Sequence, residues 1–151
     1  MKLLTAKKIK NSWKLFDENH NLIGKRKFIG FLGNRKQLEV NGNIYRIKDR
    51  GFFSNEIHYE SESGRLLIRI DYVHQRVFCY GESVTEIYYF KSKLWSKKMS
   101  LHKLENDHLV MNFNFKRSFS KYTFEIETDE NFDNSLLIMV FFDLNMRNFE
   151  D

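Results

Sequence analysis

Apolar and polar residues alternate in short runs along most of the chain, and this pattern changes only near the C-terminus. From residue 13 to residue 127 the runs are separated by clusters of Gly, Asn, Asp and Ser. Alternation with a period of two is typical of strands with one buried face. Turn signals about every 8–12 residues are typical of an all-β sandwich or barrel. The pattern predicts roughly ten or eleven strands over residues 13–127.

The clearest hairpin is predicted at Asn41-Gly42. These two residues tolerate the positive φ angles that a type I′ turn requires. A two-residue loop here pairs Val40 with Asn43 and Leu38 with Tyr45, which places the apolar side chains of both strands on one face. Other strands are predicted at 13–16, 22–31, 57–59, 66–72, 76–80, 84–90, 109–115 and 122–126, and residues 2–10 are expected to form a basic, frayed terminus.

The segment from Asn134 to Phe149 is the one long apolar stretch in the sequence. Asp133, Asn134 and Ser135 are all good N-cap residues, so a helix is predicted over about 135–149. Its apolar side chains would occur on every side, and such a helix must be enclosed by other elements. A final β-strand is the alternative, because Val, Ile and Phe also favour strands.

Together these patterns predict an all-β fold, a sandwich or barrel of short meandering strands around a hydrophobic C-terminal α-helix. A length of 151 residues suits one domain, and the chain contains no linker rich in Gly, Ser or Pro and no internal repeat. We therefore expect residues 1–151 to form a single domain. The aromatic content of 16% also favours strands.

Asp143 is the ionisable residue that follows the seven unbroken apolar residues Leu136–Phe142. It lies four residues before Arg147, which is the helical spacing for an ion pair. The pair is expected to solvate the helix where it leaves the barrel. The alternative is that Asp143 orients a ligand at the barrel mouth.

Charge is distributed unevenly along the chain. Residues 1–121 contain 24 Lys and Arg against 12 Asp and Glu, whereas residues 122–151 contain one against eight. A basic body can bind nucleic acid or anionic lipid head groups. Alternatively, the acidic loop around Asp129, Glu130 and Asp133 simply neutralises neighbouring lysines in the fold.

Two basic clusters are the candidate anion-binding sites, although such clusters are also common on ordinary solvated faces. A tryptophan among lysines suits a membrane interface or a nucleic acid, where the ring inserts or stacks while the charges contact phosphates. The first cluster comprises Lys25, Arg26, Lys27, Arg35 and Lys36, and the second comprises Lys91, Lys93, Lys97 and Lys98 around Trp95.

Recognisable catalytic and cofactor motifs are absent from the sequence. It contains no P-loop, no dinucleotide fingerprint and no Gly-x-Ser-x-Gly elbow. Its five histidines lack the spacing of a zinc site. Cys79 is expected to be a buried structural thiol rather than a nucleophile, because no activating partner is evident. We therefore predict no catalytic residue, no metal site and no cofactor.

The cellular location is also predicted from the sequence. A single cysteine cannot form an intramolecular disulfide, and the first residues lack the apolar run of a signal peptide. We expect a cytoplasmic protein that can associate peripherally with a membrane.

The end of the chain resembles a known superfamily over about 113–145. The aromatic-flanked strand Tyr122–Ile126, a polar loop and the apolar run Ser135–Asp143 are similar to the C-terminal end of the tubby-like superfamily, which includes tubby domains, LURP-one-related proteins and phospholipid scramblases. This resemblance implies that the all-β fold is a closed antiparallel β-barrel of short meandering strands enclosing a hydrophobic C-terminal α-helix. The Pro-rich leader and cysteine cluster of scramblases are absent, so scramblase activity is not implied.

Three functions remain open from the sequence. The leading hypothesis is a non-enzymatic module that binds anionic lipid head groups or other phosphorylated ligands through its basic clusters. The second is a small nucleic-acid-binding barrel. The third is a lipocalin-like carrier of a small apolar ligand, which would require an unfilled interior. The oligomeric state is not predicted.

Overall fold

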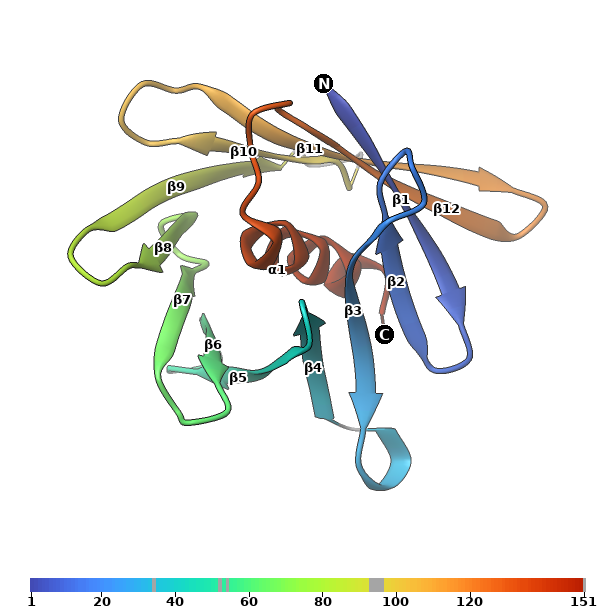
Figure 1. Cartoon of the computed structure of the whole chain (residues 1–151), viewed down its shortest axis with the longest axis horizontal. Helices are drawn as coiled ribbons and strands as arrows, with labels where there is room; N and C mark the ends of the chain where they lie inside the picture. The colour runs from blue at the N-terminus through green and yellow to red at the C-terminus, as the bar shows by residue number, and fades with distance from the viewer. Residues whose placement is uncertain (34, 52, 54, 93–96, 151) are drawn as a thin grey trace.

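A closed barrel of β-strands surrounds one α-helix in the computed structural model, which describes residues 1–33, 35–51, 53, 55–92 and 97–150 (Figure 1). Within these residues, strands adjacent in the chain pair antiparallel, and β12 closes the barrel against β1. The predicted fold class is thus confirmed. The strands are β1 (Lys2–Ile9), β2 (Ser12–Phe16), β3 (Leu22–Ile29), β4 (Arg35–Val40), β5 (Asn43–Arg50), β6 (Glu56–Ser61), β7 (Leu66–Asp71), β8 (Arg76–Tyr80), β9 (Thr85–Ser92), β10 (Met99–Lys103), β11 (Leu109–Ser118) and β12 (Lys121–Thr128).

Two of these strands differ from the sequence prediction. The expected frayed terminus is wrong, because β1 pairs with both β2 and β12 and buries Leu4 and Ala6. The sequence also gave no strand at β10, where Met99 and Leu101 are buried. Each of these two strands contributes only two inward apolar side chains among polar neighbours. Two alternating positions are too few to predict a strand from the sequence.

The hairpin at Asn41-Gly42 forms as predicted. Asn41 has φ 52° and Gly42 has φ 78°, as a type I′ turn requires. Val40 pairs with Asn43 and Leu38 pairs with Tyr45, which confirms the predicted register.

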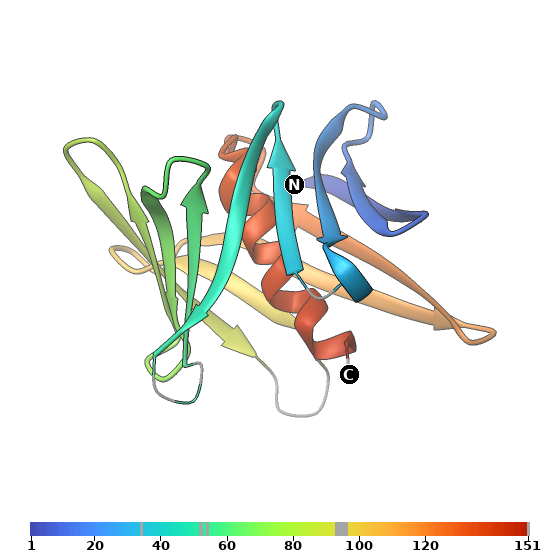
Figure 2. The same ribbon diagram turned by 90° about the horizontal axis from the view of Figure 1, so that it is seen from below.

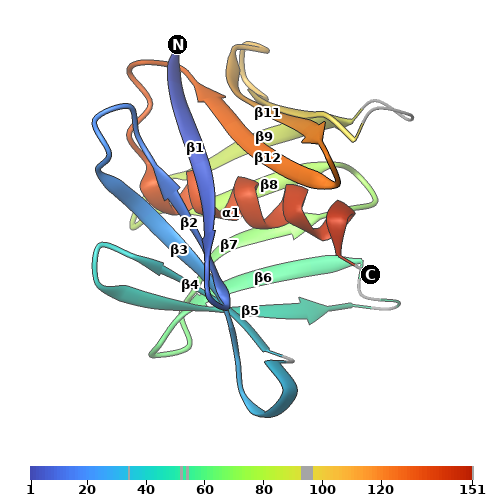
Figure 3. The ribbon, with the colours of Figure 1, turned by 90° about the vertical axis from the view of Figure 1, so that its right-hand side faces the viewer.

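The terminal apolar segment forms a helix, α1 (Ser135–Met146), so the alternative of a final strand is wrong. The side-chain oxygen of Asn134 caps it by accepting a hydrogen bond from the backbone N–H of Leu137 at 3.1 Å. Every residue from 137 to 146 is buried, and Figure 3 shows the helix running through the interior of the barrel. The helix thus occupies the space that a lipocalin-like carrier would need.

Because the strands form an antiparallel meander, successive connections lie at opposite ends of the barrel. We call the end where α1 begins the upper end and the end where it finishes the lower end, as Figure 2 shows them. The lower end carries the connections β1–β2, β3–β4, β5–β6, β7–β8, β9–β10 and β11–β12. The upper end carries the five alternate hairpin connections and the link from β12 to α1.

A short 3-10 helix, η3 (Arg147–Phe149), follows α1 at the lower end. The ring of Phe149 lies 4.8 Å from that of Phe124 and 4.9 Å from that of Phe115, measured between centroids. These contacts anchor the C-terminal segment to β11 and β12. No helix among the described residues is long and apolar enough to span a bilayer.

Replacing a core residue of α1 should destabilise the whole fold. The side chain of Phe142 has no exposed surface, and removing a buried phenylalanine ring typically costs about 3–5 kcal/mol. We expect Phe142→Ala to lower the free energy of unfolding by this amount in urea denaturation. Phe31→Ala is the control, because Phe31 is 88% exposed and should change stability by less than about 0.5 kcal/mol. Equal effects of the two substitutions would contradict the enclosed helix.

Candidate functional site

The three consecutive basic residues of β3 do not form one surface. Lys25 and Lys27 lie on the outer face, where both pair with Glu39 of β4 at 4.0 Å and 2.6 Å. Arg26 points into the barrel and is fully buried. The prediction that Arg26 is an accessible anion ligand is therefore wrong, because neighbouring residues of a strand face opposite sides.

Arg26 belongs to a buried ionic cluster centred on Asp143. Its Nε donates to Asp143 Oδ1 at 2.7 Å, while the Tyr59 hydroxyl donates to Oδ2 at 2.5 Å. Arg147 Nε also donates to Oδ2, at 3.3 Å, so the predicted pairing across one helical turn is confirmed. The expectation that Asp143 meets water is wrong, because β3 and β6 supply partners that enclose it completely.

The cluster fixes the protonation states of its members. Burial alone would raise the pKa of Asp143, but the charges of Arg26 and Arg147 and the hydrogen bonds from Tyr59 and Arg26 outweigh burial and lower it. Burial raises the pKa of Tyr59 well above its ordinary value, and the adjacent Asp143 raises it further. At neutral pH Asp143 is therefore ionised and Tyr59 is a neutral hydrogen-bond donor.

Two surface carboxylates extend this cluster to the outside. The guanidinium of Arg26 contacts both carboxylate oxygens of Glu150, with Nη2 at 3.0 Å from Oε2, and Lys36 Nζ reaches the same oxygen at 2.9 Å. Arg147 Nη1 donates to Asp49 at 3.0 Å. The C-terminal segment is thereby tied to β3, β4 and β5.

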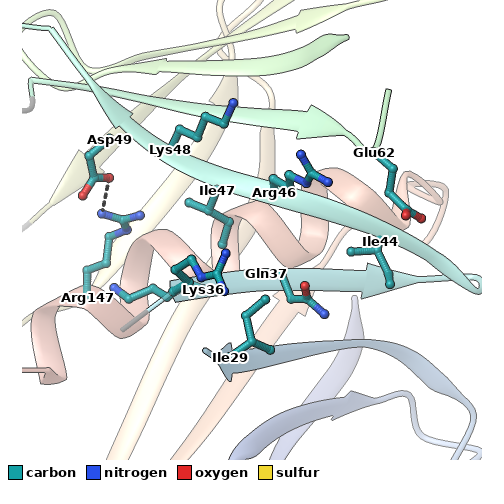
Figure 4. A pocket seen from close by; sticks show the side chains of 11 residues that line it. Ile29, Lys36, Gln37, Ile44, Arg46, Ile47, Lys48, Asp49, Glu62 and Arg147 are labelled. Atoms are coloured by element: carbon teal, nitrogen blue, oxygen red, sulfur yellow. Dashed lines mark hydrogen bonds and ion pairs between the residues drawn. The ribbon is translucent and has the colours of Figure 1, made fainter. Parts of the chain in front are cut away.

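A groove lies outside this cluster, where β4 and β5 separate. The two strands pair from Gln37 and Arg46 up to the turn. Towards the lower end, Arg35 and Lys36 pair only with β3, and the rest of β5 pairs only with β6. The resulting space, which we call the seam groove, has a volume of about 570 Å³ (Figure 4).

The seam groove is predominantly basic, with five basic and two acidic residues among those lining it. Three of its cations are neutralised by ion pairs with carboxylates. The other two, Arg35 and Arg46, are exposed and form no ion pair with a residue that the structure describes. The basic residues are Arg35, Lys36, Arg46, Lys48 and Arg147, and the acidic residues are Asp49 and Glu62.

The second predicted cluster is only partly within the described residues. Lys91 and Lys98 line a different surface hollow, beside β10 and β11. Lys97 instead turns to the C-terminal segment, where its Nζ donates to the carbonyl of Asn148 at 3.0 Å and lies 5.0 Å from the centroid of the Phe149 ring. Lys93 and Trp95 lie outside the described residues.

The structure also bears on the remaining chemical candidates. Cys79 is partly buried, and burial, followed by the charge of Glu86, raises its pKa to about 12. The thiol is therefore protonated at neutral pH and a poor nucleophile. Among the residues that the structure describes, no group of three or more His, Cys, Asp and Glu side chains could hold a metal ion.

Sequence reasoning missed several residues of the site. Arg46 lies opposite Gln37 in the predicted hairpin, so extending its register would have placed Arg46 on the outer face near the first basic cluster. Tyr59 and Glu150 gave no such signal. Their partners are 84 and 124 residues away in the chain, and only the barrel brings them together.

Removing the central carboxylate of the cluster should be costly. Asp143→Asn would leave the buried Arg26 poorly compensated, and breaking a buried ion pair typically costs about 3–5 kcal/mol of unfolding free energy. Urea denaturation measures this loss. Asp49→Asn is the control, because Asp49 is 50% exposed and an exposed pair is worth only about 0–1 kcal/mol. A loss below 1 kcal/mol in Asp143→Asn would contradict the role of the cluster.

The same carboxylate should make stability depend on pH. Its pKa is lower in the folded protein than the ordinary 3.8, so its stabilisation is present above about pH 4 and is lost as pH falls towards the folded pKa. We expect unfolding free energy to fall less steeply below about pH 5 in Asp143→Asn than in the wild type. Denaturation series at several pH values measure the slopes. Parallel slopes would show that Asp143 does not titrate with unfolding.

Comparisons with known proteins leave the family of this chain open. No protein-family model matches the sequence, and no curated protein matches it. A similar solved structure is the X-ray structure of a protein from Arabidopsis thaliana. It has 14% sequence identity and a TM-score of 0.48, over 97% of this chain and 91% of that chain. This similarity assigns the chain to no family, and the resemblance to the tubby-like superfamily stays a prediction.

Proposed function

We propose that the protein is a non-enzymatic binding module whose seam groove takes an anionic, phosphate-bearing ligand. The observation that supports this most directly is that Arg35 and Arg46 line the same groove without a carboxylate partner among the described residues. A guanidinium presents paired N–H donors that match phosphate oxygens, and it stays charged at any physiological pH. The phosphate can belong to a lipid head group or to a soluble molecule.

The size and lining of the groove also support a small ligand. Its volume of about 570 Å³ falls in the range of about 300–1,000 Å³ that is usual for ligand sites. Ile29, Ile44 and Ile47 line it beside the charged residues, so a ligand can place an apolar part against these side chains while its phosphate meets the arginines.

Binding is proposed rather than catalysis because two of the nearby carboxylates already have structural partners. Asp49 pairs with Arg147, and Asp143 is enclosed by its hydrogen-bond donors. A general base must reach the proton that it removes. The proposal includes a cytoplasmic site of action, in part at a membrane surface.

Neutralising the two unpaired arginines should weaken binding of a phosphorylated probe. We expect Arg35→Gln and Arg46→Gln each to raise the Kd for inositol hexakisphosphate by roughly ten-fold or more, because a hydrogen bond to a charged group contributes about 1.5–3 kcal/mol. Isothermal titration calorimetry measures the change. Arg117→Gln is the matched control, since Arg117 is an exposed arginine on β11, outside the groove.

Several outcomes of these titrations would contradict the seam groove as the binding site. Unchanged affinity in the double variant Arg35→Gln/Arg46→Gln would refute the groove as the site, and so would an equal loss in Arg117→Gln. Affinity that does not fall with added salt would contradict an electrostatic site. Repeating the titration with phosphoinositide-containing vesicles distinguishes a lipid head group from a soluble ligand.

A further inference from the structure

The most exposed large apolar side chains of the described residues are three phenylalanines at the lower end of the barrel. Phe31, Phe53 and Phe119 are 88%, 90% and 100% exposed. They lie in the β3–β4, β5–β6 and β11–β12 connections, which belong to three separate hairpins. Less exposed apolar side chains occur at the upper end too, such as Val84 at 67%, so the lower end is distinguished by the high exposure of its aromatic side chains.

The turn that presents Phe119 is unfavourable for its own residues. Phe119 and Ser120 form the two-residue loop between Ser118 and Lys121, with φ angles of 49° and 67°. The same chain uses Asn-Gly for a loop with two positive φ angles at 41–42, as is usual. A phenylalanine at positive φ is strained, and strain of this kind clusters at functional sites. The conformation of the turn therefore does not explain why a phenylalanine occupies position 119.

The hairpin connections at the two ends of the barrel differ in charge. The described residues of the lower-end hairpin connections, at 10–11, 30–33, 51, 53, 55, 72–75, 97–98 and 119–120, include no Asp or Glu and three lysines. The upper-end connections, at 17–21, 41–42, 62–65, 81–84, 104–108 and 129–134, contain nine acidic residues and one Lys or Arg. Such a separation orients a molecule in the field of a charged surface.

We propose that the lower end is a contact face for anionic lipid membranes, in which Phe31 and Phe119 insert between the head groups and the surrounding lysines and arginines meet the lipid phosphates. The proposal rests on the proposed function for the anionic nature of the partner, and it adds an apolar contact and an orientation. Aromatic side chains combined with cationic ones bind the interfacial layer of a bilayer, and a negatively charged leaflet attracts the basic residues.

A membrane fits this face better than a folded protein partner does. The exposed rings of the described residues stand on three separate hairpins, whereas protein interfaces bury a contiguous apolar surface. A fluid lipid surface can accept isolated rings at separate points. The acidic upper end would be repelled by the same lipids and would therefore point away from them.

The position of the seam groove agrees with this orientation. The two strands that border the groove separate towards the lower end, where Arg35 and Lys36 no longer pair with β5. Phe31 lies in η1 (Phe31–Gly33), which leads directly into Arg35 at the start of β4. A ring inserted at Phe31 would thus bring this part of the groove close to the lipid head groups.

Vesicle binding by serine variants tests the proposal. Sedimentation with phosphatidylcholine vesicles containing about 30% phosphatidylserine supplies the anionic surface. We expect Phe31→Ser and Phe119→Ser each to weaken partitioning by roughly ten-fold, with a larger loss in the double variant, because each removes a buried ring from the bilayer. Val84→Ser is the matched control, since it removes an exposed apolar side chain at the upper end. Inositol hexakisphosphate should bind these variants as it binds the wild type.

A fluorescence measurement supplies an independent positive result. Phe119→Trp should shift its emission to shorter wavelength when the vesicles are added, whereas Val84→Trp should not. If the Phe31→Ser/Phe119→Ser variant partitions to vesicles as the wild type does, the membrane face is refuted. The proposed ligand site in the seam groove would not be affected by that result. If Arg46→Gln loses binding of inositol hexakisphosphate while its vesicle binding still depends on Phe119, the result would support both the seam groove and the membrane face.

Two further outcomes would overturn the membrane face. One is an equal loss of partitioning in Val84→Ser, because it would remove the distinction between the two ends. The other is that the wild-type protein does not bind the vesicles but binds single-stranded RNA, and that this binding depends on Phe119. The exposed rings would then stack on bases.

Discussion

A single buried carboxylate organises this protein. Asp143 lies on a helix that is apolar all round and is enclosed by a barrel, where an uncompensated charge would be very costly. Arg26 from β3 and Tyr59 from β6 supply the compensation. These directional contacts favour one rotation and one depth of α1 within the barrel, something that non-directional apolar packing specifies less sharply.

The same cluster connects the core to the surface. Arg147 joins Asp143 to Asp49 on β5, and Glu150 joins Arg26 to Lys36 on β4. The two strands that border the seam groove are therefore both tied to the end of the central helix. A site held by such contacts is preorganised, which reduces the entropy lost when a ligand binds.

The barrel also rearranges the charge of the sequence. Along the chain, charge divides into a basic body and an acidic tail, but in space the connections at the two ends of the barrel differ in charge. The acidic loop at 129–134 lies with other acidic connections at the upper end rather than against a lysine cluster. Within it, Asp129 pairs with His108, and Glu130 pairs with the N-terminal amine. The antiparallel meander produces this separation, because every second connection returns to the same end.

The sequence by itself determined the local structure and the need for an enclosed helix. Period-two alternation specified most strands, Asn41-Gly42 specified a register, and a run that is apolar on all sides specified burial. Closure through β1, the partners of Asp143 and the seam groove were decided only by the tertiary structure. The pairing of Lys2 with Thr128 and the contact of Arg26 with Glu150 join residues more than a hundred positions apart. Hydrophobic periodicity carries no information about such partners, because it reports which face of an element is buried and not what lies against it.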